Sequence, residues 1–398
     1  MQNFTYHAPT EVVFGKDTEQ QAGSLVQKYG GTKVLLVYGG GSVVRSGLLE
    51  RVKGSLKEAG IAYAEWGGVR PNPRLSHAQE GTEHAIREQV DFVLAVGGGS
   101  CIDTAKAIAH GVKHPGVDLW DLWSKKIPVG EMLPVGCVLT IAAAGSEMSD
   151  SAVLTNEVLG KKAGLSTPLN RPKFAIMNPE ITFTLPKYQI ACGIADIMMH
   201  TLERYFIPKQ RNRMTDEIAE GVLRTMIENG KKAIANPADY DAMSEIMWAG
   251  SISHNDLTGL GRVKDFSVHK LGHALSAKFD VAHGASLAAV WGDWAKYVYE
   301  NDLERFCHYG KAVWGITTED TKQAAAEAIQ CTVSFFEEIG MPTCLSELGI
   351  GILDEETLRS LAMNATAGGT MELSHIRKLN VEDVYEIFAR ANHEKYLK

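Results

Sequence analysis

The sequence predicts an α/β domain followed by an all-helical domain. Two observations carry this prediction: short apolar strand patterns alternate with helical patterns in the first half, and strand patterns stop near residue 187. Continuous apolar strands that alternate with helices are typical of a parallel sheet covered on both faces. A chain of 398 residues is also long enough for two domains, each with a core of its own.

The elements of the first half can be placed one after another. The first clear strand is the apolar run Lys33–Tyr38, which ends at three glycines, and the helical pattern Leu48–Ala59 follows it and ends at Gly60. Next come, in chain order, strand Ile61–Trp66, helix Gln79–Gln89, strand Asp91–Val96, helix Ile102–His110, and strands Leu133–Thr140 and Phe174–Met177.

The second half has helical periodicity only. Its clearest segments are Asn212–Ala235, Asp239–Leu257, Glu319–Ile339 and Val381–Ala391. We place the boundary in the Pro179–Pro186 segment, so that residues 1–183 form the α/β domain and residues 184–398 the helical domain. A ligand site in the cleft between two such domains is the natural expectation.

Composition excludes several classes of protein. The 48 acidic residues exceed the 40 Lys and Arg, and the net charge of -8 argues against a nucleic-acid binder, which usually needs a basic face. No apolar run reaches the roughly 18 residues of a membrane span. The N-terminal segment lacks the pattern of a secretory signal, and the six cysteines are scattered without a CxxC pair. We therefore expect a cytoplasmic protein with reduced thiols.

A glycine-rich turn follows the strand Asp91–Val96. Gly97, Gly98, Gly99 and Ser100 stand where this strand gives way to a helix. Glycine lets the backbone approach a ligand closely, and the helix start offers free N–H groups and the positive end of the helix dipole. The turn therefore predicts a phosphate seat. The alternative is a tight turn without a ligand, because this is not the G-x-G-x-x-G fingerprint.

A second such turn, Tyr38–Ser42, follows the first strand. Many dinucleotide enzymes place an acid here to bind the ribose hydroxyls of adenosine. Here Gly40, Gly41 and Ser42 leave room for an anionic group, and Arg45 is close in sequence. The turn therefore favours NADP(H) over NAD(H), with an ordinary turn as the alternative. The rigid Arg70–Arg74 turn, with Asn72 at its centre, either lines a nucleotide or is a plain loop.

The strongest chemical signal lies in the helical half. Two pairs are spaced four residues apart and so share a helix face, Asp196 with His200 and His269 with His273, and His283 follows before a glycine. A carboxylate and three imidazoles form a plausible ligand set for Zn²⁺ or Fe²⁺, which leaves one histidine for proton transfer. The alternative is a set of core histidines. Nearby apolar residues suggest an apolar substrate pocket: Phe266, Trp291 and Trp294.

Together these motifs resemble the iron-containing (group III) alcohol dehydrogenases. The shared patterns are GGGSxxDxxK at 97–106, DxxxH at 196–200, HxxxH at 269–273 and His-Gly at 283–284. The segment 268–284 is most similar to the branch of butanol dehydrogenases and NADPH-dependent aldehyde reductases. The resemblance covers essentially the whole chain. It implies a Rossmann-like dinucleotide-binding domain over 1–183 and a helical metal-binding domain over 184–398, an architecture shared with dehydroquinate synthase.

The resemblance also implies residue roles. The metal ligands would be Asp196, His200, His269 and His283, and His273 would carry a proton. The cofactor-binding residues would be Gly40, Gly41, Ser42, Asn72, Gly97, Gly98, Gly99, Ser100, Asp103, Thr140, Lys162 and Thr182. Gly40 stands where NAD-preferring members carry an acid, which agrees with NADP(H).

The implied activity is the interconversion of primary alcohols and aldehydes, of butanol and butyraldehyde type, with NADP(H) and Fe²⁺ or Zn²⁺. Three alternatives remain: a polyol oxidoreductase of the glycerol dehydrogenase type, a lyase of the dehydroquinate synthase type, and a non-catalytic protein that binds metal and nucleotide. We expect neither nucleic acid nor membrane as a partner. The Phe4–Phe14 segment suggests a strand that pairs across a two-fold axis, so a homodimer is expected.

Overall fold

The computed structural model describes residues 1–208 and 212–395, which fold into two compact units. The α/β unit comprises residues 7–185 and 237–251, and the helical unit comprises residues 1–6 and 186–236 together with the chain from Ile252 onward. Two short segments therefore pack with the unit that lies farther from them in sequence.

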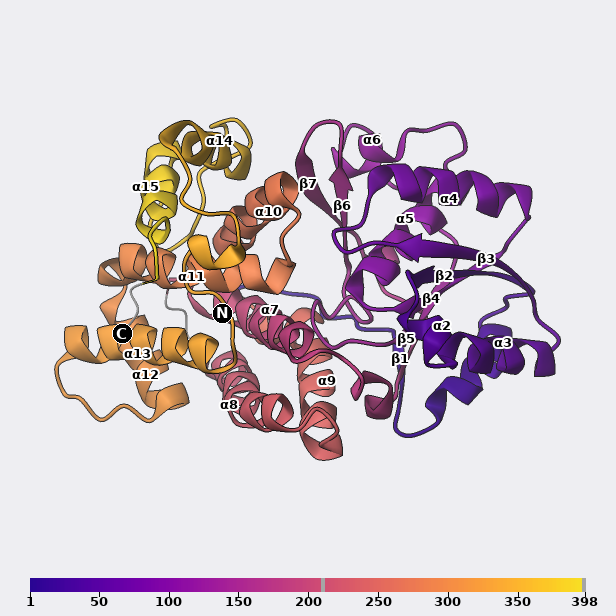
Figure 1. Cartoon of the computed structure of the whole chain (residues 1–398), viewed down its shortest axis with the longest axis horizontal. Helices are drawn as coiled ribbons and strands as arrows, with labels where there is room; N and C mark the ends of the chain where they lie inside the picture. Colours follow the sequence, from indigo (N-terminus) through magenta and orange to yellow (C-terminus); the bar gives the residue numbers. More distant parts are fainter. Residues whose placement is uncertain (209–211, 396–398) are drawn as a thin grey trace. The chain divides into compact units, whose positions relative to one another are not determined.

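A parallel sheet of six strands forms the centre of the α/β unit (Figure 1). Its strands are β1 (Glu11–Phe14), β2 (Lys33–Gly39), β3 (Ala62–Val69), β4 (Phe92–Gly97), β5 (Val135–Leu139) and β8 (Phe174–Met177), in the order β1-β8-β5-β4-β2-β3. The carboxyl ends of β4 and β2, where both glycine-rich turns begin, are therefore neighbours at one edge of the sheet.

Helices cover both faces of this sheet. They are α1 (Ala22–Lys28), α2 (Ser42–Arg45), α3 (Leu48–Glu58), α4 (Leu75–Arg87), α5 (Gly99–Lys113) and α6 (Leu119–Trp123). Alternate residues of β2 point to opposite faces. Val34 and Leu36 belong to a hydrophobic cluster that also contains residues of α1 and α3. Helix α5, which is outside this cluster, packs against β2 and β4. The predicted parallel sheet with two covered faces is confirmed.

An antiparallel hairpin outside this sheet was not predicted. Its strands are β6 (Ser151–Asn156) and β7 (Lys161–Ser166). β7 carries two lysines and a glycine, so it lacks the apolar run that marks the sheet strands. Ala152, Leu154 and Leu165 nevertheless pack into a second cluster with α4 and α6.

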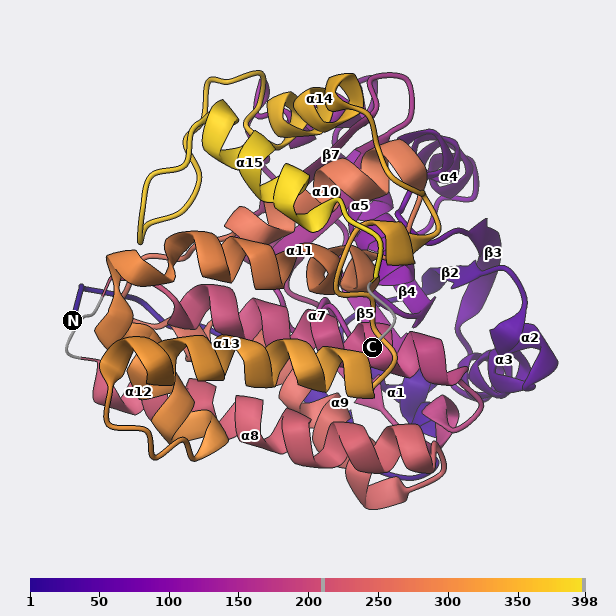
Figure 2. The ribbon, with the colours of Figure 1, turned by 60° about the vertical axis from the view of Figure 1, so that its left-hand side comes forward.

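The helical unit is built from α7 (Lys187–Tyr205), α8 (Arg213–Ala235), α10 (Ser267–Phe279), α11 (His283–Val298), α12 (Leu303–Trp314), α13 (Thr321–Glu338), α14 (Glu355–Ala365) and α15 (Val381–Ala391). α9 (Tyr240–His254) contributes residues to both units. Figure 2 shows α7, α8, α12 and α13 lying side by side. The described part of this unit contains no strand, as predicted.

Short 3-10 helices complete the secondary structure: Thr18–Gln21, Pro168–Asn170, Pro179–Thr182, Leu257–Gly259, Tyr299–Asn301 and Ser346–Leu348. Among the described residues, no helix is both long and apolar enough to cross a bilayer. All six cysteines are free of disulfide bonds, as expected.

One buried ion-pair network holds the end of α7. The Asp216 carboxylate of α8 accepts from Arg262 at 2.6 Å and from both terminal nitrogens of Arg305 at 2.6 and 2.9 Å. Arg305 also donates from Nε to the Tyr205 carbonyl at 2.9 Å and stacks on the Tyr205 ring. This network ties α7 to α8 and α12.

Candidate functional site

Asp196, His200 and Glu203 lie on one face of α7. Positions i, i+4 and i+7 fall nearly above one another on an α-helix. Asp196 and His200 are each only 3% exposed, and Asp196 Oδ1 lies 3.5 Å from His200 Nδ1. The predicted pair on α7 is therefore buried, with its two side chains close together.

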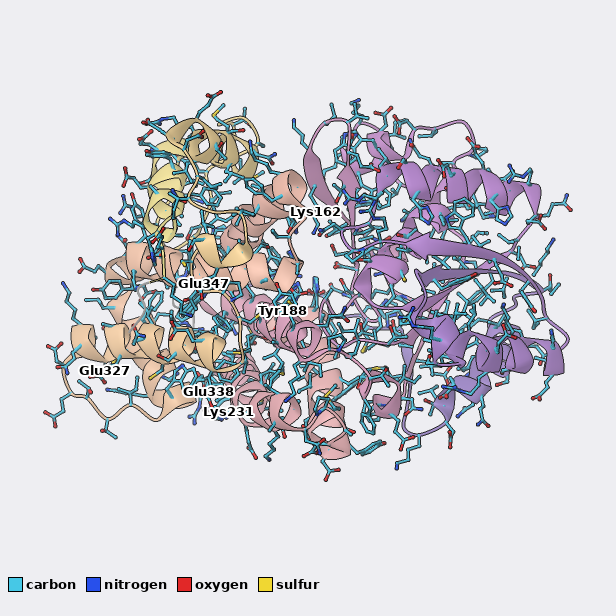
Figure 3. All side chains as sticks on the ribbon, in the orientation of Figure 1. Lys162, Tyr188, Lys231, Glu327, Glu338 and Glu347 are labelled. Carbon is cyan, nitrogen blue, oxygen red and sulfur yellow. The ribbon has the colours of Figure 1, made fainter. Side chains whose placement is uncertain are left out.

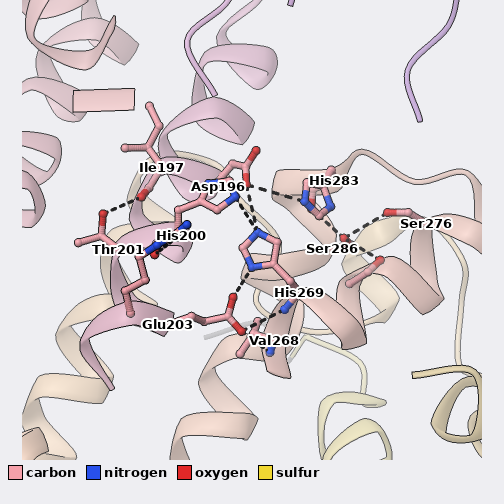
Figure 4. Close-up of polar contacts among 12 residues, drawn as sticks. Asp196, Ile197, His200, Thr201, Glu203, Val268, His269, Ser276, His283 and Ser286 are labelled. Atoms are coloured by element: carbon pink, nitrogen blue, oxygen red, sulfur yellow. Dashed lines mark hydrogen bonds and ion pairs between the residues drawn. The ribbon is translucent and has the colours of Figure 1, made fainter. Parts of the chain in front are cut away.

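Two further helices bring imidazoles to this carboxylate (Figure 4). His269, near the start of α10, has its Nε2 3.6 Å from Asp196 Oδ1 and 3.1 Å from His200 Nε2. His283, the first residue of α11, has its Nε2 3.8 Å from the same Asp196 oxygen. The four residues predicted as metal ligands thus meet around one carboxylate oxygen.

Two glycines explain why the helices can approach so closely. A Cβ on Gly284 would lie 2.0 Å from the Cys192 carbonyl oxygen of α7, so only glycine lets α11 begin there. A Cβ on Gly272 of α10 would lie 2.6 Å from the Leu287 side chain of α11. The glycine after His283 therefore has a packing role, because it sets that imidazole beside Asp196.

The donor atoms fit a divalent metal. Asp196 Oδ1 and His200 Nδ1 are buried and have no hydrogen-bond partner within the described part of the chain. A buried polar atom without a partner costs free energy, which a bound cation would recover. Asp196, His200 and His269 each offer a ligand atom, all within 4.8 Å of one another. Carboxylate and imidazole donors suit Zn²⁺ and Fe²⁺ alike.

Without a metal ion, the pKa values of two imidazoles of the cluster shift in opposite directions. Burial lowers the pKa of His200 well below its usual range, and the neighbouring His254 and His269 act in the same direction, so His200 is neutral. Burial alone would also lower the pKa of His269, but the Glu203 and Asp196 carboxylates outweigh it and raise that pKa to about 9.

His273 lies beside the cluster, one helical turn after His269. Its ring centroid is 6.1 Å from that of His269 and 5.2 Å from that of His283. It is half-buried, whereas Asp196, His200 and His269 are buried. A proton carrier needs contact with both the site and solvent, and the position of His273 is compatible with this role.

Sequence reasoning missed two residues of this site. The Glu203 carboxylate accepts a hydrogen bond from His269 Nδ1, and the ring of His254 lies 4.0 Å from that of His200. Glu203 could have been found, since it continues the face of Asp196 and His200 along α7. His254 stands at the end of α9, and no spacing connects it to the other histidines.

The predicted apolar pocket is wrong for the two tryptophans. Trp291 and Trp294 are buried in the core of the helical unit, where both rings contact Phe206. Their helical spacing places them on the inner face of α11, which favours the core over a pocket. Phe266 alone lies near the cluster, with its ring edge-on to His269 at 5.5 Å.

The turn after β4 is tightly packed. A Cβ on Gly97 would lie 2.4 Å from Cys101 Sγ, and one on Gly98 would lie 2.2 Å from the Ile141 side chain. Packing therefore requires both glycines, with or without a ligand. The feature that favours a phosphate is the start of the 15-residue helix α5 at Gly99, because first-turn N–H groups have no intrahelical partner.

The turn after β2 is open. A Cβ on Gly40 would meet nothing within 4 Å, and Ser42 is exposed. A Cβ on Gly41 would lie 2.8 Å from Arg45 Nη1, so the guanidinium folds back over the turn. The positively charged Arg45 thus lies beside the turn that is predicted to bind an anionic group of the cofactor.

Asn72 and Lys162 are brought together by the fold. Lys162 of β7, labelled in Figure 3, donates from Nζ to Asn72 Oδ1 at 3.0 Å. Asn72 adopts a left-handed φ of 55°, which asparagine tolerates well. Arg70 and Arg74 of the same turn line a pocket of about 440 Å³.

The remaining predicted cofactor residues, Thr140, Asp103 and Thr182, differ in their surroundings. Thr140 donates its N–H to the Gly97 carbonyl at 3.1 Å, so it adjoins the β4 turn. Both Asp103 carboxylate oxygens already accept bonds, from Ser146 Oγ at 2.6 Å and the Val153 N–H at 2.9 Å. Thr182 is fully buried and donates to the Pro179 carbonyl, so its contact with a cofactor stays a prediction.

Sequence comparisons identify related families for both halves of the chain. Residues 9–179 match the family described as iron-containing alcohol dehydrogenase, and residues 190–392 match the C-terminal region of the Fe-containing alcohol dehydrogenase family. The two matches together span both the glycine turns and the Asp/His cluster.

Individual relatives match over nearly their full lengths. NADH-dependent butanol dehydrogenase A of Clostridium acetobutylicum is 42% identical, covering 98% of this chain and 100% of the relative. The NADPH-dependent aldehyde reductase YqhD of Escherichia coli is 35% identical, with 98% and 100% covered. The crystal structure of NADH-dependent butanol dehydrogenase A from Thermotoga maritima superposes with a TM-score of 0.94 at 37% identity, covering 99% of each chain.

Proposed function

The chain belongs to the iron-containing alcohol dehydrogenase family and interconverts alcohols and aldehydes with a nicotinamide cofactor, and we propose that its substrates are primary alcohols and aldehydes of about butanol size. The observation that carries the proposal is the buried meeting of Asp196, His200, His269 and His283 from three helices. We assign these four as metal ligands, the helical unit as the metal-binding domain, and the α/β unit as the dinucleotide-binding domain.

In this proposal each residue has a defined task. The four ligands hold the ion, and the first turn of α5 with Gly98, Gly99 and Ser100 binds the cofactor pyrophosphate. When bound, the metal supplies a Lewis acid that polarises the substrate oxygen and reduced nicotinamide supplies the hydride. His273 donates the proton that the product alcohol gains at its oxygen, and accepts it in the reverse direction.

The proposal is tested with protein stripped of metal. We expect no oxidation of NADPH by the stripped protein with butyraldehyde, and recovery of turnover after Fe²⁺ or Zn²⁺ is added. Dihydroxyacetone in place of butyraldehyde tests the polyol alternative, which would be favoured if it were reduced faster. Tight NADPH binding without turnover under any metal would contradict the proposal.

We further propose that NADP(H) is preferred over NAD(H). The β2 turn has no acid, and Arg45 lies over Gly41, where it can pair with a 2′-phosphate. The relatives do not decide the preference, because some are named for NADH and others for NADPH.

Replacing Gly40 with aspartate should reverse this preference. The new side chain has open space, so the change adds charge without a clash. Repulsion of the 2′-phosphate by about 1.5–3 kcal/mol corresponds to a loss of roughly 10- to 150-fold in NADPH affinity. The measurement is the ratio of kcat/KM for NADPH and NADH. Gly40→Ala is the matched control and should keep the wild-type ratio, and an unchanged ratio in Gly40→Asp would remove the argument.

We also propose a homodimer. Of the predicted Phe4–Phe14 strand, only Glu11–Phe14 forms a strand, β1, and residues 4–10 do not. β1 pairs with β8 alone in the described sheet, so its other edge is open, and Phe14 at its end is 39% exposed. An open strand edge is a template for pairing with a second copy. Light scattering should give twice the chain mass of 43.4 kDa. A particle of single-chain mass at micromolar concentration would contradict this proposal.

A further inference from the structure

The Glu203 carboxylate is buried at the point where α10 begins. Its side chain is 0% exposed. Oε1 accepts the backbone N–H of Val268 at 2.5 Å and that of His269 at 3.2 Å, and Oε2 contacts His269 Nδ1 (Figure 4). One carboxylate thus binds both the backbone and the ring of His269, from a helix more than 60 residues away in sequence.

This contact defines the tautomer of His269. An ionised carboxylate can only accept hydrogen bonds, so the ring hydrogen on Nδ1 is donated to Glu203. The other ring nitrogen, Nε2, is then directed at the Asp196 oxygen 3.6 Å away. A neutral imidazole binds a metal through the nitrogen that lacks hydrogen, so the tautomer set by Glu203 is the one that ligation needs.

The hydrogen bonds of Glu203 could not be made by an apolar side chain in its place. A buried carboxylate is costly unless it is paired and hydrogen-bonded. Here two backbone N–H groups at the start of α10 and one imidazole N–H satisfy it, and the positive end of the helix dipole is favourable for its charge.

We propose that Glu203 is a positioning residue of the metal site, which holds His269 in the orientation and tautomer required for binding the ion. The inference rests on the proposed role of His269 as a ligand. α7 then supplies two ligands, Asp196 and His200, and also the support for the third. The pattern Asp-x-x-x-His-x-x-Glu on one helix places all three on the same face.

The test is the Zn²⁺ affinity of the full-length protein, measured by competition with a fluorescent chelator. In Glu203→Gln the amide keeps the size of the side chain, and its carbonyl can still accept the backbone N–H groups. Its NH₂ group would face Nδ1 and favour the opposite tautomer. We expect Zn²⁺ to bind 10- to 100-fold more weakly, the usual effect of losing such a supporting contact.

Three comparisons make the result specific. Glu203→Asp keeps the charge and should recover part of the affinity. Glu220→Gln changes another carboxylate with a buried side chain, which accepts from Tyr205 and pairs with His308, and should leave Zn²⁺ affinity unchanged. The melting temperature of each metal-free variant reports any loss of fold separately.

The outcomes separate the inference from the function on which it rests. If the wild-type protein does not bind Zn²⁺, or His269→Ala binds it equally well, the ligand assignment fails. If the wild type binds and His269→Ala does not, but Glu203→Gln binds as well as the wild type, the positioning role is overturned. A lower melting temperature with unchanged affinity would likewise make Glu203 purely structural. If Glu203→Gln does not fold, Glu203→Asp decides. Its shorter side chain cannot reach His269 as Glu203 does, so we expect Zn²⁺ to bind at least threefold more weakly than in the wild type. Wild-type affinity in Glu203→Asp would then overturn the positioning role.

Discussion

Replacing Asp196 with alanine is expected to remove the metal and lower turnover by at least about 1000-fold. Asp196 Oδ1 is the atom on which the site converges, at 3.5 Å from His200, 3.6 Å from His269 and 3.8 Å from His283. Its loss leaves three imidazoles without the one negative charge among the four proposed ligands. Loss of a Lewis acid that supplies several kcal/mol corresponds to about three orders of magnitude in rate.

The measurement is metal content after reconstitution and dialysis, together with turnover. The metal-free variant should melt close to the metal-free wild type, because Asp196 Oδ1 makes no hydrogen bond within the described chain. Asp216→Ala is the matched control. It leaves Arg262 and Arg305 buried without their partner, so it should melt several degrees lower yet retain metal. Full metal occupancy in Asp196→Ala would refute the ligand assignment.

Replacing His273 with alanine is expected to slow turnover by about 100- to 10,000-fold while metal content stays at the wild-type level. The ring of His273 is 5.2 Å from that of His283, so it adjoins the site without being one of the four residues proposed as ligands. An effect on kcat without loss of metal would distinguish proton transfer from ligation.

Two further measurements sharpen this result. Added imidazole should restore part of the rate of His273→Ala, because it can occupy the space of the missing ring and carry the proton. His308→Ala is the control: this exposed histidine pairs with Glu220, so its loss should leave the rate unchanged. A full rate in His273→Ala, with full metal content, would show that the proton takes another route.

The sheet and its covering helices could be predicted because their signals are local. The buried strands β2 and β4 are continuous apolar runs that end in glycine, and their burial on both faces follows from that pattern alone. The hairpin strand β7 escaped prediction because its sequence, KKAGLS, has no continuous apolar run. Its pairing with β6 and the packing of Leu165 and Ala163 hold it in place. Likewise, the apolar Trp291 and Trp294 of α11 suggested a substrate pocket from sequence alone. Their contacts with Phe206 place them in the core.

The sequence by itself determined which residues share a helix face. Asp196 with His200, and His269 with His273, follow from the 3.6-residue repeat, which depends on backbone geometry and not on the rest of the fold. Only the tertiary structure decided that α7, α10 and α11 meet, that His283 faces Asp196, and that Glu203 orients His269. Those contacts join residues 66 to 87 positions apart, and they depend on close packing such as that of Gly284 against Cys192, which no local pattern records.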